Sequence, residues 1–266
     1  MTFIFSSGGG VQSTACLVLS AQGRIPYKTH IFSNVGDNAE DPRTIVYIRD
    51  VLRPYAAAHG IEWVEVQRRR RDGTPVDLYD DLHRPIRAIN IPVRMRNGAP
   101  GRRSCTTDWK IAPIAKWIKA NAPGCTLGKG ISTDEYHRAT PARESDGYTS
   151  AYPLIDLGIS RDGCLRLVKE AGLPQPPKSS CWFCPFKTSH GWQALRTERP
   201  ELFRKATDLE QLLNEKRGSL GKDRVYLSSV GARRGLPIDQ AFADQPSLLP
   251  EWIDEQDGCE SGYCMT

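Results

Sequence analysis

The chain has 266 residues, of which 39% are apolar, and this size and composition allow one large globular domain or one domain with an appendage. Its 36 lysines and arginines outnumber its 31 aspartates and glutamates. This small excess permits an anionic partner but is well below that of a dedicated DNA-binding domain. The sequence contains no apolar run of the roughly 18 residues that span a membrane, and its first residues do not resemble a secretory signal. We therefore expect a soluble, cytoplasmic protein without a membrane partner.

In the first two thirds of the chain, apolar runs of strand length alternate with longer amphipathic stretches. This pattern predicts an α/β fold with a doubly wound, mostly parallel sheet. The predicted strands are residues 2–5, 30–33, 61–66 and 126–131. The predicted helices are residues 13–21, 42–59, 111–120, 164–171 and 201–217. We divide the chain into an α/β domain, residues 1–158, and a small, cysteine-bearing, helical C-terminal region, residues 159–266.

Two arginine-rich segments follow the third predicted strand. Arg68–Arg71 is a run of four arginines, which is either a solvated loop or a contact for the phosphates of a nucleic acid. Residues 84–104 hold six arginines among three prolines. A long irregular segment that also contains Ile and Val is typical of a functional loop. These arginines keep a nucleic-acid substrate among the candidates.

A glycine cluster lies near the amino terminus, in the sequence FIFSSGGGVQSTACLVL. A strand that leads through Gly8, Gly9 and Gly10 into a helix places backbone N–H groups at a helix N-terminus, where the helix dipole favours an anion. Glycine lets the backbone approach a phosphate, and Ser13 and Thr14 add hydroxyl donors. The alternative is a tight turn without a ligand. The spacing fits neither the G-x-x-x-x-G-K-[ST] nor the G-x-G-x-x-G phosphate-binding pattern.

The loop does resemble the S-G-G-x-D-S pyrophosphate loop of the PP-loop superfamily, which includes ATP pyrophosphatases, adenylating tRNA thiolases and phosphoadenosine phosphosulfate reductases. Gly8 and Gln12 stand in place of the serine and the aspartate of that pattern. Later segments resemble motifs of the phosphoadenosine phosphosulfate reductase-like family in the family's own order; they are residues 33–44, 103–113, 130–138, 152–156 and 181–185. The sequence is therefore similar to this family, which is related to enzymes of DNA phosphorothioation and tRNA thiolation.

The resemblance implies an adenine nucleotide alpha hydrolase-like fold and a site for an adenine nucleotide, either ATP or phosphoadenosine phosphosulfate. The residues that it places at this site are Ser7, Gly8, Gly9, Gly10, Gln12, Ser13, Thr14, Asn34, Asp37, Gly130 and Glu135. Lys110 and Arg138 are candidate catalytic cations that would neutralise phosphates or a sulfonate; otherwise they are solvated surface charges. The carboxylates of Asp37 and Glu135 can hold Mg²⁺ or orient ribose hydroxyls, and Asp37 is alternatively a turn residue.

Eight cysteines in a chain whose first residues do not resemble a secretory signal favour metal, redox or catalytic roles over disulfides. Cys181 and Cys184 form a C-x-x-C motif. Together with Cys105 and Cys164 they make a four-thiolate set that suits either Zn²⁺ or a [4Fe–4S] cluster. The family resemblance favours the iron–sulfur cluster. If Cys164 is instead a half-buried helix residue, a three-cysteine cluster leaves one iron open to sulfide or substrate.

Cys259 and Cys264 lie in a polar, glycine-containing sequence near the carboxyl end. They are either residues of a disordered tail or mobile, exposed nucleophilic thiols of a persulfide carrier or a reductase. Reductases of the resembled family carry a nucleophilic cysteine on such a tail. We therefore add Cys259 and Cys264 to the candidate catalytic residues.

These observations predict a PP-loop enzyme that adenylates a substrate oxygen and replaces the AMP with sulfur. The sulfur would come from the cluster or the tail thiols, supplied by a donor such as a cysteine desulfurase. The acceptor is a nucleobase, a nucleic-acid backbone or a small metabolite. Two alternatives stay open: a phosphoadenosine or adenosine phosphosulfate reductase that uses Cys259 or Cys264 as nucleophile, and a non-catalytic, zinc-stabilised nucleic-acid-binding module.

Overall fold

The structure, a computed structural model, describes residues 1–85, 88–142 and 147–243, which form two compact units. The described part of unit 1 consists of Met1–Asp77 and Thr106–Ser180. Unit 2 consists of Leu78–Cys105 and the described residues from Cys181 onward. This division differs from the predicted boundary at residue 158, because residues 78–105 group with unit 2 and residues 159–180 group with unit 1.

Unit 1 is built on a five-stranded parallel sheet with the strand order β3-β2-β1-β4-β5. Its strands are β1 (Phe3–Ser7), β2 (Thr29–Asn34), β3 (Glu62–Gln67), β4 (Cys125–Lys129) and β5 (Tyr148–Ala151). The α/β class and the parallel sheet predicted from the sequence are confirmed. The chain leaves β1 toward β2 on one side and later adds β4 on the other side. The carboxyl ends of β1 and β4 therefore form the switch point at which ligands bind in open α/β sheets.

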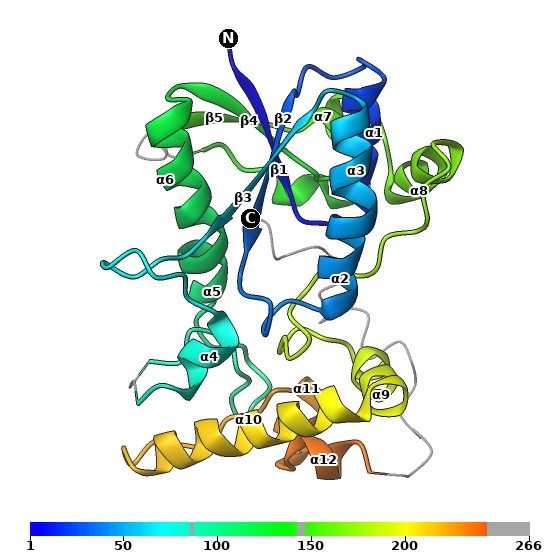
Figure 1. Cartoon of the computed structure of the whole chain (residues 1–266). Coiled ribbons are helices and arrows are strands. Elements are labelled where there is room, and N and C mark those ends of the chain that lie inside the picture. Colours follow the sequence, from blue (N-terminus) through cyan, green and yellow to red (C-terminus); the bar gives the residue numbers. More distant parts are fainter. Residues whose placement is uncertain (86–87, 143–146, 244–266) are drawn as a thin grey trace. The chain divides into compact units, whose positions relative to one another are not determined.

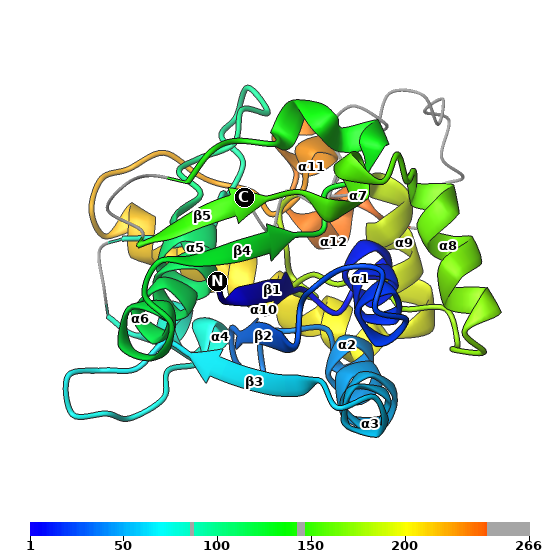
Figure 2. The ribbon, with the colours of Figure 1, turned by 90° about the horizontal axis from the view of Figure 1, so that it is seen from above.

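Helices cover both faces of this sheet (Figures 1 and 2). One face carries α1 (Val11–Ala21), α2 (Pro42–Tyr47), α3 (Arg53–Ala58) and α8 (Arg161–Glu170). A π-helical turn, Ile48–Leu52, joins α2 to α3, so the predicted helix at residues 42–59 is one continuous helical stretch. The other face carries α6 (Ala112–Asn121), which follows a π-helical turn at Thr107–Ile111. A 3₁₀ helix, Thr133–Arg138, follows β4, and the short α7 (Pro153–Asp156) follows β5.

Apolar side chains fill the layers on both faces of the sheet. Leu19 of α1 belongs to one buried cluster with Cys164 and Val168 of α8. On the opposite face, Ile114 and Ile118 of α6 are buried against apolar side chains of the strands. Burial of such side chains stabilises the layers by about 1.5 to 3 kcal/mol for each fully buried residue. This packing fixes the ends of the strands from which the site is built.

A polar residue, His30, is completely buried in β2. Its Nδ1 lies 2.9 Å from Oγ of Ser7, and its Nε2 lies 3.1 Å from Oγ of Ser20. The Ser20 hydroxyl donates its proton to the Cys16 carbonyl at 2.8 Å, so it accepts from Nε2–H, and Nδ1 accepts from Ser7. Burial lowers the pKa of His30 to about 3. The ring is therefore neutral, with one defined tautomer.

Unit 2 is mainly helical. It contains α4 (Leu78–His83), α9 (Ser189–Glu198), α10 (Pro200–Gly218), α11 (Ser229–Arg234) and α12 (Ile238–Ala241). The chain passes from unit 2 back to unit 1 within the short α5 (Ser104–Thr106). Glu210 of α10 accepts hydrogen bonds from the backbone N–H groups of Leu227 (2.6 Å) and Ile238 (3.0 Å). Burial raises the pKa of Glu210 to about 7. Within the described part of the chain, no helix combines the length and the apolar character that a membrane span requires.

The arginine-rich segment at residues 88–105 belongs to unit 2, and its arginines bind groups of that unit. Arg94 is buried and donates to the carbonyls of Pro185 (3.3 Å) and Gly98 (3.2 Å). Arg96 donates to two carbonyls of α11 at 2.9 and 2.7 Å. These two side chains stabilise unit 2, which is a structural use that the sequence could not reveal because most of the acceptors are distant in the chain.

Candidate nucleotide-binding site

The glycine loop joins β1 to α1 at the carboxyl end of the central strand. Gly9 has φ = +74°, and a Cβ atom there would lie 3.0 Å from side-chain atoms of both Thr44 and Ile48. Only glycine fits this position without strain. Gly10 is the N-cap residue of α1, and no side chain of the described residues caps the helix there. Among these residues, the first N–H groups of α1 therefore have no intrahelical acceptor and no side-chain cap.

Two sets of hydrogen bonds hold this loop. The hydroxyls of Ser13 and Thr14 both donate to the Gly10 carbonyl at 3.0 Å. The hydroxyl of Ser179 donates to the Gly8 carbonyl. Ser13 and Thr14 thus shape the loop from within the first turn of α1.

Ser7 was also predicted to contact the nucleotide. Its hydroxyl instead points into the core and donates to Nδ1 of His30 at 2.9 Å. This hydrogen bond ties the carboxyl end of β1 to β2 just before the glycine loop. Thr44 lies against Gly9, and its buried hydroxyl has no hydrogen-bond partner among the residues that the structure describes.

Lys110 is brought to the glycine loop by the π-helical turn before α6. It is 8% exposed and lines a small cavity together with Gly8 and Ser33. The Ser33 hydroxyl donates to the carbonyl of Trp109 at 2.9 Å and so ties this turn to β2. The predicted cation therefore lies beside the loop that is predicted to hold phosphate.

A second cation at this loop is Arg161, at the start of α8. Its Nη1 lies 3.5 Å from Oε1 of Gln12, in the first turn of α1. The Asp134 carboxylate accepts a hydrogen bond from the backbone N–H of Arg161 at 2.5 Å, which fixes the start of the helix. Sequence reasoning did not single out Arg161, because no motif marks it and 149 positions separate it from its partner.

Gly130 follows β4 and faces the same helix end. A Cβ atom at this position would lie 3.4 Å from Cβ of Gln12 and from the backbone nitrogen of Ser13. Alanine would just fit, whereas a longer side chain would cover the N-terminus of α1. The predicted site residue Gly130 thus leaves space at the point where the anion is expected.

Glu135 and Arg138 form an ion pair of 2.8 Å, and both side chains are buried. Burial raises the pKa of Glu135 above its usual value, and the charge of Arg138 acts in the opposite direction. Arg138 is therefore held by a carboxylate of its own segment. The structure brings these two predicted residues together.

Asn34 and Asp37 shape the turn at the end of β2. Oδ1 of Asn34 accepts from the backbone N–H of Gly36 at 2.8 Å, and its Nδ2 donates to Asp37 and to Glu65, both at 2.9 Å. The amide group of Asn34 is occupied by these bonds. Their structural role in the turn agrees with the alternative that the sequence left open for Asp37.

The predicted metal ligand Cys164 lies in the core of unit 1. It is completely buried among apolar side chains and belongs to one cluster with Cys16. Burial, and in addition the charge of Cys164, raise the pKa of the Cys16 thiol. Burial raises the pKa of Cys164 to about 12, which disfavours the thiolate that a metal binds. Cys164 and Val168 occupy one apolar face of α8 at a helical spacing of four residues, so the place of Cys164 in the core agrees with the alternative of a buried helix residue.

Cys105, Cys181 and Cys184 all belong to unit 2 and are half-buried. Cys181 and Cys184 flank a turn in which the Cys184 N–H donates to the Cys181 carbonyl at 3.1 Å. The described residues contain no group of three or more Cys, His, Asp or Glu side chains arranged to hold a metal ion. The predicted catalytic residues Cys259 and Cys264 lie outside the described residues.

Two solved enzyme structures are similar to this chain. One is phosphoadenylyl-sulfate (PAPS) reductase from Candida auris in a phosphate complex, with a TM-score of 0.42 and 14% identity over 66% of this chain and 75% of the other. The second is the U34-tRNA thiolase NcsA from Methanococcus maripaludis with its [4Fe-4S] cluster, with a TM-score of 0.46 and 15% identity over 84% and 73% of the two chains. No family model and no curated protein matches the sequence. The predicted resemblance is confirmed as a structural similarity at low sequence identity, which concerns the fold alone.

Proposed function

We propose that unit 1 binds an adenine nucleotide and that the protein adenylates a substrate oxygen in preparation for sulfur transfer. The observation that carries this proposal is the arrangement of Gly8–Gly10 at the N-terminus of α1 with Lys110 beside Gly8. The backbone N–H groups and the cation would hold phosphates there, and Arg161 adds a second positive charge. The hydroxyl of Thr44, which has no hydrogen-bond partner in the described part of the chain, supplies a further polar group next to the loop.

In the proposed reaction the substrate oxygen attacks the α-phosphorus of ATP, and the bond to pyrophosphate breaks. Lys110 and Arg161 would stabilise the negative charge that develops on the leaving pyrophosphate. A sulfur nucleophile then attacks the carbon that carries the adenylated oxygen, and AMP leaves with that oxygen. A persulfide on Cys259 or Cys264, loaded by a donor such as a cysteine desulfurase, would attack through its outer sulfur and form a disulfide to that carbon. The thiolate of the other cysteine would then break this disulfide, which releases the thiolated product and leaves a Cys259–Cys264 disulfide for an external thiol to reduce.

Product analysis with protein purified without oxygen tests this proposal. We expect pyrophosphate and AMP to form from ATP when a sulfur donor and an acceptor are present, and sulfur to appear in the acceptor. Sulfite release from phosphoadenosine phosphosulfate with a thiol reductant would establish the reductive alternative. Zinc content with salt-sensitive nucleic-acid binding and no turnover would establish the non-catalytic module.

The variant Lys110→Gln is expected to weaken ATP binding by roughly ten- to a hundredfold, because a charged hydrogen bond to phosphate contributes about 1.5 to 3 kcal/mol. Isothermal titration calorimetry measures this change. Lys119→Gln is the matched control, since Lys119 is an exposed cation on α6. Equal affinities of the Lys110→Gln variant and the native protein would remove Lys110 from the site.

For the metal site we propose that Cys181 and Cys184 of the C-x-x-C motif are ligands of an iron–sulfur cluster and that Cys164 takes no part; the described residues do not place a third Cys, His, Asp or Glu ligand beside this pair. When bound, such a cluster would supply an iron position open to sulfide or substrate. We expect Cys181→Ser and Cys184→Ser to abolish bound iron, measured by elemental analysis and absorbance. Cys164→Ser should retain iron but lose about 1 to 3 kcal/mol of stability, because it buries a hydroxyl among apolar groups. Loss of iron in Cys164→Ser, or zinc in place of iron, would contradict the proposal.

A further inference from the structure

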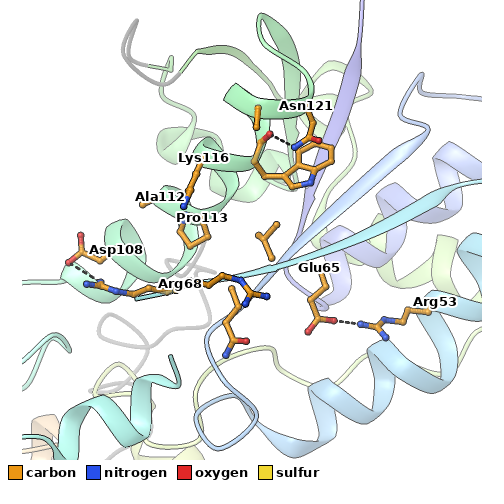
Figure 3. A pocket seen from close by; sticks show the side chains of 13 residues that line it. Arg53, Glu65, Arg68, Asp108, Ala112, Pro113, Lys116 and Asn121 are labelled. Carbon is orange, nitrogen blue, oxygen red and sulfur yellow. Dashed lines mark hydrogen bonds and ion pairs between the residues drawn. The ribbon is translucent and has the colours of Figure 1, made fainter. Parts of the chain in front are cut away.

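A groove of about 950 Å³ lies between β3 and α6 in unit 1 (Figure 3). Its residues are not those of the glycine loop or of the small cavity beside Lys110. β3 is an edge strand of the sheet within the described residues, where it pairs only with β2. Val66 of β3 and Pro113 and Trp117 of α6 give the groove an apolar lining. Trp117 is half-buried, so part of its indole is accessible.

The charges along this groove are mainly positive. Arg53, Arg68, Arg69 and Lys116 line it, against the two carboxylates of Glu65 and Asp108. Glu65 forms an ion pair with Arg53, and Asp108 lies 3.9 Å from Arg68. Both carboxylates are thus neutralised by neighbouring cations, as Figure 3 shows. The exposed Arg69 and Lys116 supply the excess positive charge.

The four consecutive arginines extend this positive surface. The Val76 N–H donates to the Arg68 carbonyl and the Arg70 N–H donates to the Thr74 carbonyl, both at 2.9 Å, so the run forms one arm of a hairpin that continues β3. Arg70 and Arg71 are exposed near the tip of this hairpin. The run is therefore held at the groove by backbone hydrogen bonds rather than dispersed in an irregular loop.

We propose that this β3–α6 groove binds single-stranded nucleic acid, with phosphates on Arg69 and Lys116 and a base against Trp117. Positively charged grooves with an aromatic platform are typical of proteins that bind single strands. In a duplex the faces of the bases are stacked on one another and are not accessible to Trp117. An acidic peptide has no base that could stack on the indole, so a single strand fits the groove best. This inference goes beyond the proposed function, because it assigns a binding surface that the nucleotide site does not use.

Fluorescence anisotropy with a labelled single-stranded 12-mer of mixed sequence, in DNA and RNA form, tests the proposal. Arg69→Gln combined with Lys116→Gln is expected to weaken binding by about tenfold or more and to reduce the slope of log K against log salt by about 1.4, or 0.7 for each lost phosphate contact. Trp117→Leu is expected to weaken binding about fivefold or more, whereas Trp117→Phe retains most of the affinity. The unfolding midpoint of each variant shows that it is folded.

The matched control is Arg24→Gln combined with Lys28→Gln, which removes the same charge from exposed positions of unit 1 outside the groove. We expect this control pair to bind the 12-mer as tightly as the native protein does. Lys110→Gln is expected to leave binding of the 12-mer unchanged as well, because Lys110 does not line this groove; this result separates the present proposal from the one for the nucleotide site. Equal weakening by the control pair would overturn the proposal. Equally effective competition by duplex DNA or by oligoglutamate would also overturn it.

Discussion

Replacement of Gly9 by alanine is expected to destabilise unit 1 by about 2 to 5 kcal/mol and to abolish measurable nucleotide binding. The left-handed backbone at φ = +74° costs a residue with a Cβ about 1 to 2 kcal/mol. The new methyl group would also lie 3.0 Å from Thr44 and Ile48, and such overpacking costs about 1 to 3 kcal/mol. Urea unfolding measures the first effect, and calorimetric titration with ATP measures the second.

Gly124→Ala separates the two causes. Gly124 also has φ = +74°, but no atom of the described residues, apart from its chain neighbours, lies within 4 Å of the position that its Cβ would take. This control should therefore lose only the cost of the backbone conformation, and its ATP affinity should be unchanged. If Gly9→Ala is no less stable than Gly124→Ala, the result contradicts the close packing of the loop against α2 and the following π-helical turn.

Acid is expected to destabilise unit 1 through the buried His30. Its pKa is lowered to about 3 in the folded protein, so the unfolded chain binds the proton first as the pH falls below about 6.5. Stability is therefore complete above that pH and is lost as the pH falls from about 6.5 toward 3. At 1.36 kcal/mol per pH unit, the loss is about 2 kcal/mol at pH 5 and about 3 kcal/mol at pH 4.

His30→Gln should remove this part of the pH dependence, because a glutamine amide can hydrogen-bond to Ser7 and Ser20 but does not titrate. The unfolding free energy is measured by urea titration between pH 4 and 7. His59→Gln is the control, since His59 is exposed at the end of α3. Nuclear magnetic resonance of the imidazole nitrogens of the native protein gives an independent test, and a His30 ring that protonates near pH 6 would contradict the prediction.

Much of the fold could be predicted because apolar periodicity reports burial directly. The predicted strand at residues 61–66 is β3 (Glu62–Gln67), and the predicted helix at residues 201–217 is α10 (Pro200–Gly218). β5 was missed because three of its four residues, YTSA, carry a hydroxyl group and the segment forms no apolar run. The division into units was not predictable from composition, because it depends on contacts between segments distant in the chain.

Part of the candidate site was predicted from its glycines. Gly9 is a position where backbone conformation and close approach demand glycine, whereas Gly130 was predicted from the family resemblance. The partners of Asn34 and Ser7 could not be identified, because a hydroxyl or an amide can bind a ligand or a neighbouring side chain with equal ease. For Cys164 a signal did exist, since its spacing of four residues from Val168 marks the apolar face of α8.

The two compact units have a consequence for how the chain can be divided. The polypeptide crosses from one unit to the other after Asp77, Cys105 and Ser180, so each unit is completed by a later piece of chain. Phe3 of β1 pairs with Thr126 of β4, so strands on either side of the inserted residues 78–105 in the sequence are neighbours in the sheet. Truncation at residue 158 would remove α8 from the core of unit 1 and would leave residues 78–105 without the rest of unit 2. Neither unit can therefore be produced as a single continuous fragment by one truncation, or transferred to another protein by one fusion.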